Sequence, residues 1–429
     1  MSRPYDLVIY GASGFTGAYV VEALAKSEKK DTLKWAVAGR NETKLRKVLA
    51  DVSSKAGKNV RDVPIIIADS SDEQSLVEMA KQAVVVVNTV GPYRLHGEAV
   101  VKAAVENGAS HVDISGEPAW LEKMQMKYSE TAKEKGVYVV GACGWDSIPC
   151  DMGVNFLQQH FPGDIAFVET FVQLNTGSSG YSFNAGTYQT LILGLSEAAS
   201  DGLGKIRRAI MPEKMPRGPA RPPKRSAIFK HEGLNKWCLP FLGADKSIVN
   251  RSRYFAYTEH QEQPFYVETY LRLSSLFWAL MLVLWMMVFS FLVKFKPTRK
   301  FLQTYPDLCT FNMFKESGPT REQMDQASFV YWFFGTGWET KISDPNEQHT
   351  DKPKSKMIVR CDGPDAGYYA TSGCLLSSAL TILQDKNSLP KNGGVYTTAA
   401  AFGRDTKIYD RLAQFGITFR VVDSIEQRH

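Results

Sequence analysis

Three side chains that can move a proton each follow an apolar run of the sequence, and three more polar side chains stand beside them. The first three are Tyr93, Asp113 and Asp146, and their neighbours are Ser115, Glu117 and Ser147. Carboxyl and phenol groups are common general acids and bases, so we expect these residues to contact a substrate or transfer a proton. Each of them can instead cap a helix, hydrogen-bond a loop or pack in a turn.

A glycine-rich turn near the start of the chain is typical of a dinucleotide site. It consists of Gly11, Ala12, Ser13, Gly14, Phe15, Thr16 and Gly17, and a helical pattern begins after it. Gly11 lets the chain turn sharply, Gly14 lets backbone approach a pyrophosphate, and Gly17 lets helix and strand pack closely. The free N–H groups of the first helical turn then face an anion. The spacing alone is a weak motif, because surface turns also carry it.

Residues at three further strand ends are predicted to complete this dinucleotide site. Arg40 stands where NAD-binding folds place an acid for the ribose hydroxyl. A guanidinium there pairs with a 2′-phosphate, which predicts NADP (NADPH) rather than NAD, although Arg40 can also simply cover the sheet end. Asp69 can reach the adenine or cap the next helix. Val90, Gly91 and Pro92 are expected beside the nicotinamide, at the point where the strand order reverses.

The elements that position these residues follow from the alternation of apolar runs and helical patterns. The predicted strands lie near 6–10, 34–38, 63–68, 83–88, 110–114 and 137–142. Strands that alternate with helices predict an α/β fold with a Rossmann-type, doubly wound parallel sheet. Asn41 is expected to cap the helix that follows the second strand. We assign residues 1–150 to this NADP-binding domain.

The rest of the chain is expected to form a mixed α+β second domain for substrate binding or dimerisation. Residues 151–272 are its first part and residues 294–429 are the remainder with the C-terminal elements. Residues 205–230 hold nine Lys or Arg, one acid and five prolines. That composition cannot bury itself and predicts a mobile basic loop.

An apolar segment at 273–293 interrupts the second domain. It has 21 residues without a charge and lies between Arg272 and a basic run. Sequence patterns typical of strands and helices follow it, so both flanks are expected on one side of any membrane. This favours a helix or helical hairpin that dips into a membrane or lipid monolayer. A membrane span, a buried core helix and an oligomer contact are the alternatives. An anionic lipid surface would suit the nearby basic residues Lys294, Lys296, Arg299 and Lys300.

Composition limits the class of protein. The 429 residues carry a net charge of +6, which does not suggest a nucleic-acid partner, and the six cysteines have no C-x-x-C pair. These cysteines predict neither a metal site nor a disulfide framework. The first strand begins too early to leave room for a signal peptide. The expected location is therefore cytosol-facing and not secreted.

The combination of motifs resembles the saccharopine dehydrogenase family, especially its animal oxidoreductase-like members, over essentially the full length. The motifs are residues 11–17, 38–40, 90–98, 113–117, 144–149 and 393–397. The resemblance implies an NADP-type Rossmann domain, an oxidoreductase activity, and an association with lipid droplets or other membranes. The same motifs also resemble mycobacterial trans-acting enoyl reductases of lipid synthesis.

These observations favour an NADP-dependent oxidoreductase at a lipid droplet or membrane surface. Its expected substrate is a lipid-derived carbonyl, imine or enoyl compound. A catalytically silent dinucleotide-binding scaffold or sensor on lipid droplets is one alternative, and a true saccharopine reductase is another. The apolar segment argues against the latter, because lysine-pathway saccharopine reductases are not expected to carry one. A homodimer is left open.

Overall fold

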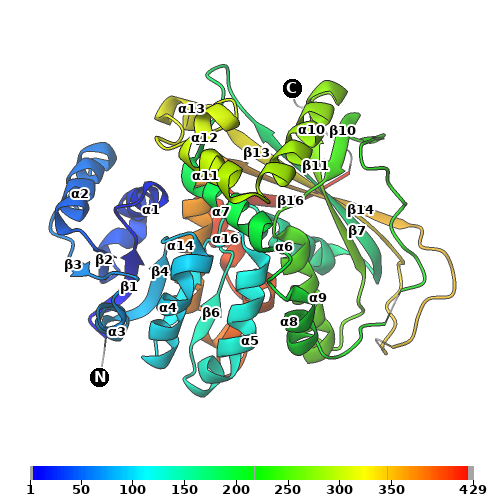
Figure 1. Ribbon diagram of the computed structural model, residues 1–429. Coiled ribbons are helices and arrows are strands. Elements are labelled where there is room, and N and C mark those ends of the chain that lie inside the picture. The colour runs from blue at the N-terminus through cyan, green and yellow to red at the C-terminus, as the bar shows by residue number, and fades with distance from the viewer. Residues whose placement is uncertain (1–2, 217, 345, 424–429) are drawn as a thin grey trace.

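Two seven-stranded sheets form the framework of the chain in the computed structural model, which describes residues 3–216, 218–344 and 346–423 (Figure 1). The first sheet is parallel throughout, in the order β15-β6-β5-β4-β1-β2-β3. Its strands are β1 (Tyr5–Tyr10), β2 (Trp35–Gly39), β3 (Ile65–Ile67), β4 (Ala83–Asn88), β5 (Ser110–Asp113), β6 (Tyr138–Val140) and β15 (Gly394–Tyr396). The order reverses between β1 and β4, which confirms the predicted doubly wound sheet and its first six strands.

Helices cover both faces of this sheet. They are α1 (Phe15–Lys26), α2 (Glu42–Ala56), α3 (Glu73–Gln82), α4 (Tyr93–Glu106) and α5 (Pro118–Glu134). The side chain of Asn41 accepts a hydrogen bond from the amide of Lys44, which confirms the predicted cap of α2. Helix α14 (Thr371–Gln384) packs against α1, β4 and β5 and is buried along nearly its whole length.

The C-terminal third therefore supplies both α14 and β15 to the first sheet. Sequence reasoning placed no element of this region there. The expected NADP-binding domain of residues 1–150 thus lacks one strand of its own sheet and one helix that covers it.

The second sheet has the order β16-β14-β13-β7-β11-β10-β9, and all its pairs are antiparallel except β7 with β11. Its strands are β7 (Ile165–Asn175), β9 (Phe229–His231), β10 (Lys236–Pro240), β11 (Tyr266–Leu273), β13 (Ser328–Gly337), β14 (Ser355–Pro364) and β16 (Thr418–Val422). A two-stranded ribbon joins β8 (Phe183–Asn184) to β12 (Phe314–Lys315). This mixed second region was predicted in outline only.

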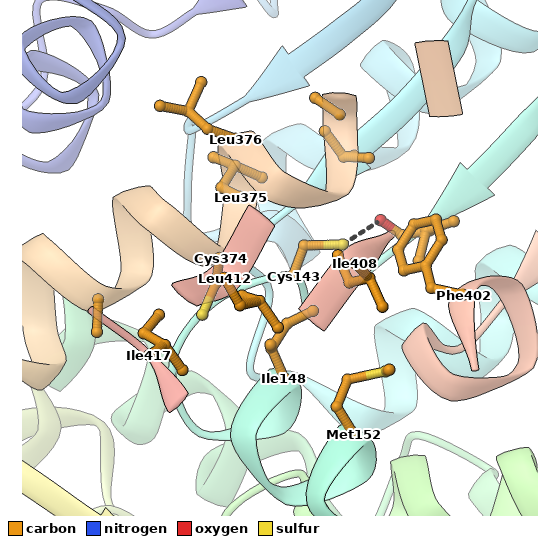
Figure 2. Close-up of a cluster of buried hydrophobic side chains, with 14 of the residues drawn as sticks. Cys143, Ile148, Met152, Cys374, Leu375, Leu376, Phe402, Ile408, Leu412 and Ile417 are labelled. Atoms are coloured by element: carbon orange, nitrogen blue, oxygen red, sulfur yellow. Dashed lines mark hydrogen bonds between the residues drawn. The ribbon is translucent and has the colours of Figure 1, made fainter. Parts of the chain in front are cut away.

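The main core lies between the two sheets, where α6 (Ser147–His160) meets α14, α15 (Thr398–Phe402) and α16 (Ile408–Gln414). Figure 2 shows Ile148 and Met152 of α6 in the same cluster as Cys374 of α14 and Leu412 of α16. Cys143 is buried there too, and its thiol lies 3.2 Å from the carbonyl oxygen of Val140. Burial raises the pKa of this thiol, so it is unsuited to act as a nucleophile.

The basic segment 205–230 differs from the loop that was expected. Helix α8 (Leu203–Ile210) contains its first residues and packs on α5. Arg207 forms an ion pair with the buried Glu122, at 3.0 Å, and Arg225 forms one with Glu169, at 2.9 Å. The prediction of a mobile basic loop was wrong at these points, because composition does not reveal that carboxylates elsewhere in the chain pair with individual arginines.

The apolar segment forms a helix, α10 (Leu276–Leu292), which packs on β10 and β11. The predicted start at residue 273 was too early, because Leu273 ends strand β11 and Ser275 caps the helix. The alternative of a buried core helix was wrong, since only Ala279 and Phe289 of α10 are buried. Within the described parts of the chain, no helix is long and apolar enough to cross a membrane.

Helices α11 (Lys296–Thr304) and α12 (Pro306–Cys309) follow and lie with α10 on the outside of the molecule, near α7 (Ala185–Glu197) (Figure 1). We call the exposed apolar side chains of this region the apolar surface. They are Leu276, Phe277, Trp278, Leu280, Met281, Leu284, Met287, Val288, Phe291, Phe295, Phe301, Tyr305, Leu308, Phe311 and Met313.

Candidate functional site

The glycine turn has the geometry that a pyrophosphate site needs. Gly11 has a φ of +86°, which side-chain-bearing residues rarely adopt. A Cβ on Gly17 would lie 2.2 Å from the carbonyl oxygen of Gly11, so only glycine fits at that point. Gly14 is the N-cap residue of α1, and no side chain caps the helix there. The amides of the first turn are therefore free of side-chain acceptors and can bind an anion.

The predicted nicotinamide loop packs directly against this turn. A Cβ on Gly11 would lie 2.7 Å from Thr89 Oγ1 and from Val90 Cγ2. The Thr89 hydroxyl donates to the carbonyl oxygen of Tyr10, at 2.9 Å. The peptide bond between Gly91 and Pro92 is cis. The structure thus brings residues 11–17 and 90–92 together at the edge where strands β1 and β4 end.

The end of β2 offers an exposed cation for a 2′-phosphate. Arg40 is exposed, and its positive charge acts on the carboxylate of the nearby Asp69. Asp69 accepts hydrogen bonds from the amide and the hydroxyl of Ser71, and these bonds lower its pKa. The cap of α3 is Asp72, so the predicted alternative role of Asp69 as that cap was wrong. A contact of Asp69 with adenine remains a prediction.

Tyr93 does not have the position of a proton donor, which corrects the sequence-based expectation. Its side chain is buried, and its hydroxyl donates to the carbonyl oxygen of Asn88, at 2.9 Å, and accepts from the amide of Ile114, at 3.2 Å. Burial raises its pKa well above the usual value. The hydroxyl therefore joins the loops after β4 and β5, because both of its hydrogen bonds go to backbone.

The substitution Tyr93→Phe tests this structural role. Loss of the hydroxyl leaves the part-buried Ile114 amide without its acceptor, and we expect stability to fall by about 1–3 kcal/mol. NADPH affinity is expected to change less than about threefold, since no hydroxyl contact with the cofactor is lost. Urea unfolding and a fluorescence titration with NADPH measure the two effects. A large loss of affinity with unchanged stability would contradict this role.

Glu117 and Ser115 also have structural partners. Glu117 accepts hydrogen bonds from the amides of Tyr93, at 2.8 Å, and Arg94, at 3.2 Å, and so caps α4. The Ser115 hydroxyl accepts from the amide of Glu117, at 3.2 Å. Ser147 is buried at the start of α6. These contacts favour the alternative that the sequence left open, in which these residues cap helices or form hydrogen bonds in loops.

Asp113 lies in a buried polar cluster beneath the strand ends. Its Oδ1 accepts hydrogen bonds from the amides of Ser115, at 2.8 Å, and Ala142, at 3.1 Å. Burial raises the pKa of Asp113 to about 7. Its Oδ2 lies 3.6 Å from Nδ1 of His111, which burial holds neutral by lowering its pKa to about 3. Asp113 can therefore hold a proton near neutral pH, but its side chain is fully buried.

Asp146 belongs to a second buried pair, which sequence reasoning missed. Its carboxyl group hydrogen-bonds that of Asp245, the first residue of α9 (Asp245–His260), and two carboxyl groups make that contact only when they share a proton. Tyr331 on β13 donates to Oδ2 of Asp245, at 3.1 Å. Burial raises the pKa of Asp146 to about 6, and burial followed by the charge of Asp146 raises that of Asp245 well above its usual value.

The backbone of Asp146 is held in an unfavourable conformation, with φ at +90°. Such conformations cluster at active sites and cost about 1–3 kcal/mol each. The carboxyl pair holds one proton at neutral pH, and Asp146 lies under backbone strain in the segment that follows β6. These features fit the predicted role of Asp146 in proton transfer. Nothing in the local sequence marks Asp245 or Tyr331, because they lie far from Asp146 in the chain.

No group of three or more His, Cys, Asp or Glu side chains within residues 3–216, 218–344 and 346–423 is placed to hold a metal ion.

Comparisons with known proteins agree with this geometry. Residues 7–140 match the family model of the saccharopine dehydrogenase NADP-binding domain. A saccharopine dehydrogenase-like oxidoreductase of Rattus norvegicus is 41% identical over 99% of both chains. The chain belongs to the saccharopine dehydrogenase-like oxidoreductases. A lipid droplet localized protein of Caenorhabditis elegans is 63% identical over 98% of this chain and 99% of its own.

The same family assignment fixes the general activity. This saccharopine dehydrogenase-like oxidoreductase uses NADP(H), as the glycine turn and Arg40 predicted. A solved structure of saccharopine dehydrogenase (L-glutamate forming) from Saccharomyces cerevisiae aligns with a TM-score of 0.53 over 97% of this chain and 100% of that chain. At 13% identity, this likeness shows the fold alone.

Proposed function

We propose that this oxidoreductase works at the cytosol-facing surface of a lipid droplet or membrane. Its proposed reaction transfers hydride between NADP(H) and a lipid-derived carbonyl, imine or enoyl group. The observation that carries this proposal is the apolar surface of α10 to α12, where Phe277, Trp278 and Phe291 are each about 60% exposed. Soluble proteins rarely expose so many large apolar side chains in one region.

The charges beside the apolar surface support a lipid surface as its partner. Lys294, Lys296 and Lys300 are exposed at the end of α10 and along α11. Each lysine near an anionic membrane contributes about 1 kcal/mol of attraction. The name of the C. elegans relative also places that protein at lipid droplets.

At the cofactor site, we propose that the glycine turn binds the pyrophosphate and that Arg40 binds the 2′-phosphate. NADPH, when bound, supplies the hydride for a reduction. Asp146 is the proposed proton donor, since its pair with Asp245 holds a proton at neutral pH. Asp113 is too enclosed for direct contact, and its proposed role is to hold the loops after β5 and β6 through the amides of Ser115 and Ala142.

A triple substitution tests the lipid surface. Three exposed apolar side chains are replaced together, by Phe277→Asp, Leu284→Asp and Phe291→Asp. Each of them contributes about 1 kcal/mol or more to lipid binding when half its surface leaves water. We expect flotation with phospholipid-coated triolein droplets to fall by at least about tenfold. The matched control is Asp51→Ala, a substitution at an exposed position on α2. Equal flotation of the triple variant would contradict the proposal.

The same preparations distinguish the alternatives. Consumption of NADPH with a whole-cell lipid extract supports the enzyme, whereas binding without consumption supports a silent sensor. Consumption with aminoadipate semialdehyde and glutamate alone supports a saccharopine reductase. A homodimer that buries the apolar surface would appear as a dimer in sedimentation that the triple variant dissociates.

A further inference from the structure

Two buried polar side chains beneath the nicotinamide loop, Asn88 and His111, have no part in the proposed reaction. Both are fully buried, at the ends of the parallel neighbours β4 and β5. The register pairs Asn88 with Asp113 and Val86 with His111. Because side chains alternate between the faces of a strand, Asn88, His111 and Asp113 share one face of the sheet. Buried polar groups need hydrogen-bond partners, so their contacts indicate what they do.

The side chain of Asn88 fixes the start of the nicotinamide loop. Its Oδ1 accepts a hydrogen bond from the amide of Val90, at 3.0 Å. The residue between them, Thr89, is held separately, because its amide and its hydroxyl both donate to the carbonyl oxygen of Tyr10, each at 2.9 Å. The position of the loop from Val90 onward therefore depends on the Asn88 amide group.

His111 holds that amide group in one orientation. Nδ2 of Asn88 lies 3.3 Å from Nε2 of His111. Burial keeps the imidazole neutral by lowering its pKa to about 3. Since an amide nitrogen can only donate, Nε2 accepts and the ring proton is on Nδ1, which faces Oδ2 of Asp113 at 3.6 Å. A flipped Asn88 amide would place two donors together at Val90 and two acceptors together at His111.

We propose that Asn88, held by His111, positions the nicotinamide loop for contact with the nicotinamide ring. The inference rests on the proposed cofactor site and on the predicted place of residues 90–92 beside that ring. A loop whose first residue is already fixed loses less conformational freedom when the cofactor binds, so the entropy cost of binding is lower. Asp113 extends the same series of buried contacts to the loops after β5 and β6, from which it accepts two amide hydrogen bonds.

Two ligands that differ only in the nicotinamide ring test this role. NADP⁺ carries the ring, whereas 2′-phospho-ADP-ribose lacks it and keeps both riboses and all the phosphates. Isothermal titration calorimetry of the full chain measures both affinities. We expect Asn88→Ala to weaken NADP⁺ binding by at least about tenfold, because the Val90 amide loses its acceptor. Binding of 2′-phospho-ADP-ribose is expected to change by less than about threefold, since the glycine turn and Arg40 keep their own contacts.

Substitutions at His111 test the orientation of the amide group. His111→Leu removes the acceptor at Nε2, so the Asn88 amide can flip, and NADP⁺ binding is expected to weaken by about threefold or more. His111→Gln supplies an amide oxygen as a new acceptor and is expected to bind NADP⁺ within about twofold of the unsubstituted protein. This pair of variants also tests the inference if Asn88→Ala fails to fold.

Tyr93→Phe is the control for destabilisation at the same place. It removes the hydroxyl that donates to the backbone carbonyl of Asn88, but the side-chain contacts of Asn88 with Val90 and His111 stay intact. Stability is expected to fall, as argued above, while the ratio of the two affinities is unchanged. A merely structural role of Asn88 would give the same unchanged ratio in Asn88→Ala.

The outcomes separate this inference from the proposed function. A parallel loss for both ligands in Asn88→Ala, or no loss for either, overturns the positioning role. Equal NADP⁺ affinities of folded His111→Leu and His111→Gln overturn the part assigned to His111. Unsubstituted protein that binds both ligands equally well overturns the contact of the loop with the ring. Unsubstituted protein that binds neither ligand overturns the proposed cofactor site itself.

Discussion

Replacement of Gly17 with alanine is expected to weaken NADPH binding by at least about 100-fold, if the protein folds. The added Cβ would lie 2.2 Å from the carbonyl oxygen of Gly11 and 2.9 Å from Cα of Ala12. Both neighbours are backbone, so the turn itself must move, and with it the amides that are positioned for the pyrophosphate. Anchoring of a dinucleotide depends on such positioning, and a factor of 100 corresponds to about 2.7 kcal/mol.

A matched glycine substitution distinguishes this effect from a general sensitivity of the chain. Gly204 lies in α8, and a Cβ there would have no neighbour within 4 Å. Gly204→Ala is expected to leave NADPH affinity unchanged and to stabilise the helix by about 0.5–1 kcal/mol. A fluorescence titration measures affinity, and circular dichroism shows whether each variant is folded. A folded Gly17→Ala protein with an affinity within about threefold of the original would contradict the proposed pyrophosphate site.

The buried pair of Asp146 and Asp245 is expected to make the protein less stable as pH rises from about 4 to about 7. The pKa of Asp146 is about 6 in the folded protein, above the unfolded value of about 4, so the folded state binds more protons in this range. Stability from the proton on Asp146 is therefore complete at low pH and is lost as pH rises through about 6, while the proton that the pair shares stays bound at neutral pH.

Asp245→Asn isolates this contribution. The variant lacks the carboxyl group of Asp245, whose pKa is raised well above its usual value, and its amide can donate to the Asp146 carboxylate in place of the shared proton. The folded variant therefore binds fewer protons as pH rises. We expect the thermal midpoint of the unsubstituted protein to decline between about pH 4.5 and about pH 7.5 more steeply than that of the variant. Asp51→Asn, at an exposed position on α2, serves as the control, with an unchanged profile. Parallel profiles for all three proteins would show that the pair does not share a proton.

The geometry of the glycine turn, the first half of the proposed cofactor site, could be predicted from sequence because its determinants are local. Gly11 adopts a positive φ in the turn, Gly17 is needed for a close contact within the same strand–turn–helix unit, and Asn41 caps a helix that begins at the next residue. Periodicity also located six of the seven strands of the first sheet. Each of these features depends on residues a few positions apart, where spacing and side-chain chemistry are sufficient evidence.

The features that sequence reasoning missed depend on contacts between distant parts of the chain. Asp245 is 99 positions from Asp146 (245 minus 146), and only the fold shows that their carboxyl groups meet. Tyr93 was predicted to be a proton donor because a phenol group can donate a proton. The structure shows that its hydroxyl is hydrogen-bonded to two backbone groups. The basic segment was predicted to be a mobile loop because nothing near it in the sequence indicates its ion pairs with Glu122 and Glu169.

The contribution of α14 and β15 to the first sheet sets the order in which this protein can complete its folding during synthesis. The glycine turn emerges from the ribosome first, but the strand that ends its sheet is Gly394–Tyr396, near the other terminus. Until then, apolar residues of β4 and β5 that α14 will cover face solvent. Transiently exposed apolar surface makes an incomplete chain prone to aggregate. The dinucleotide-binding half is therefore the first part translated and among the last to be finished.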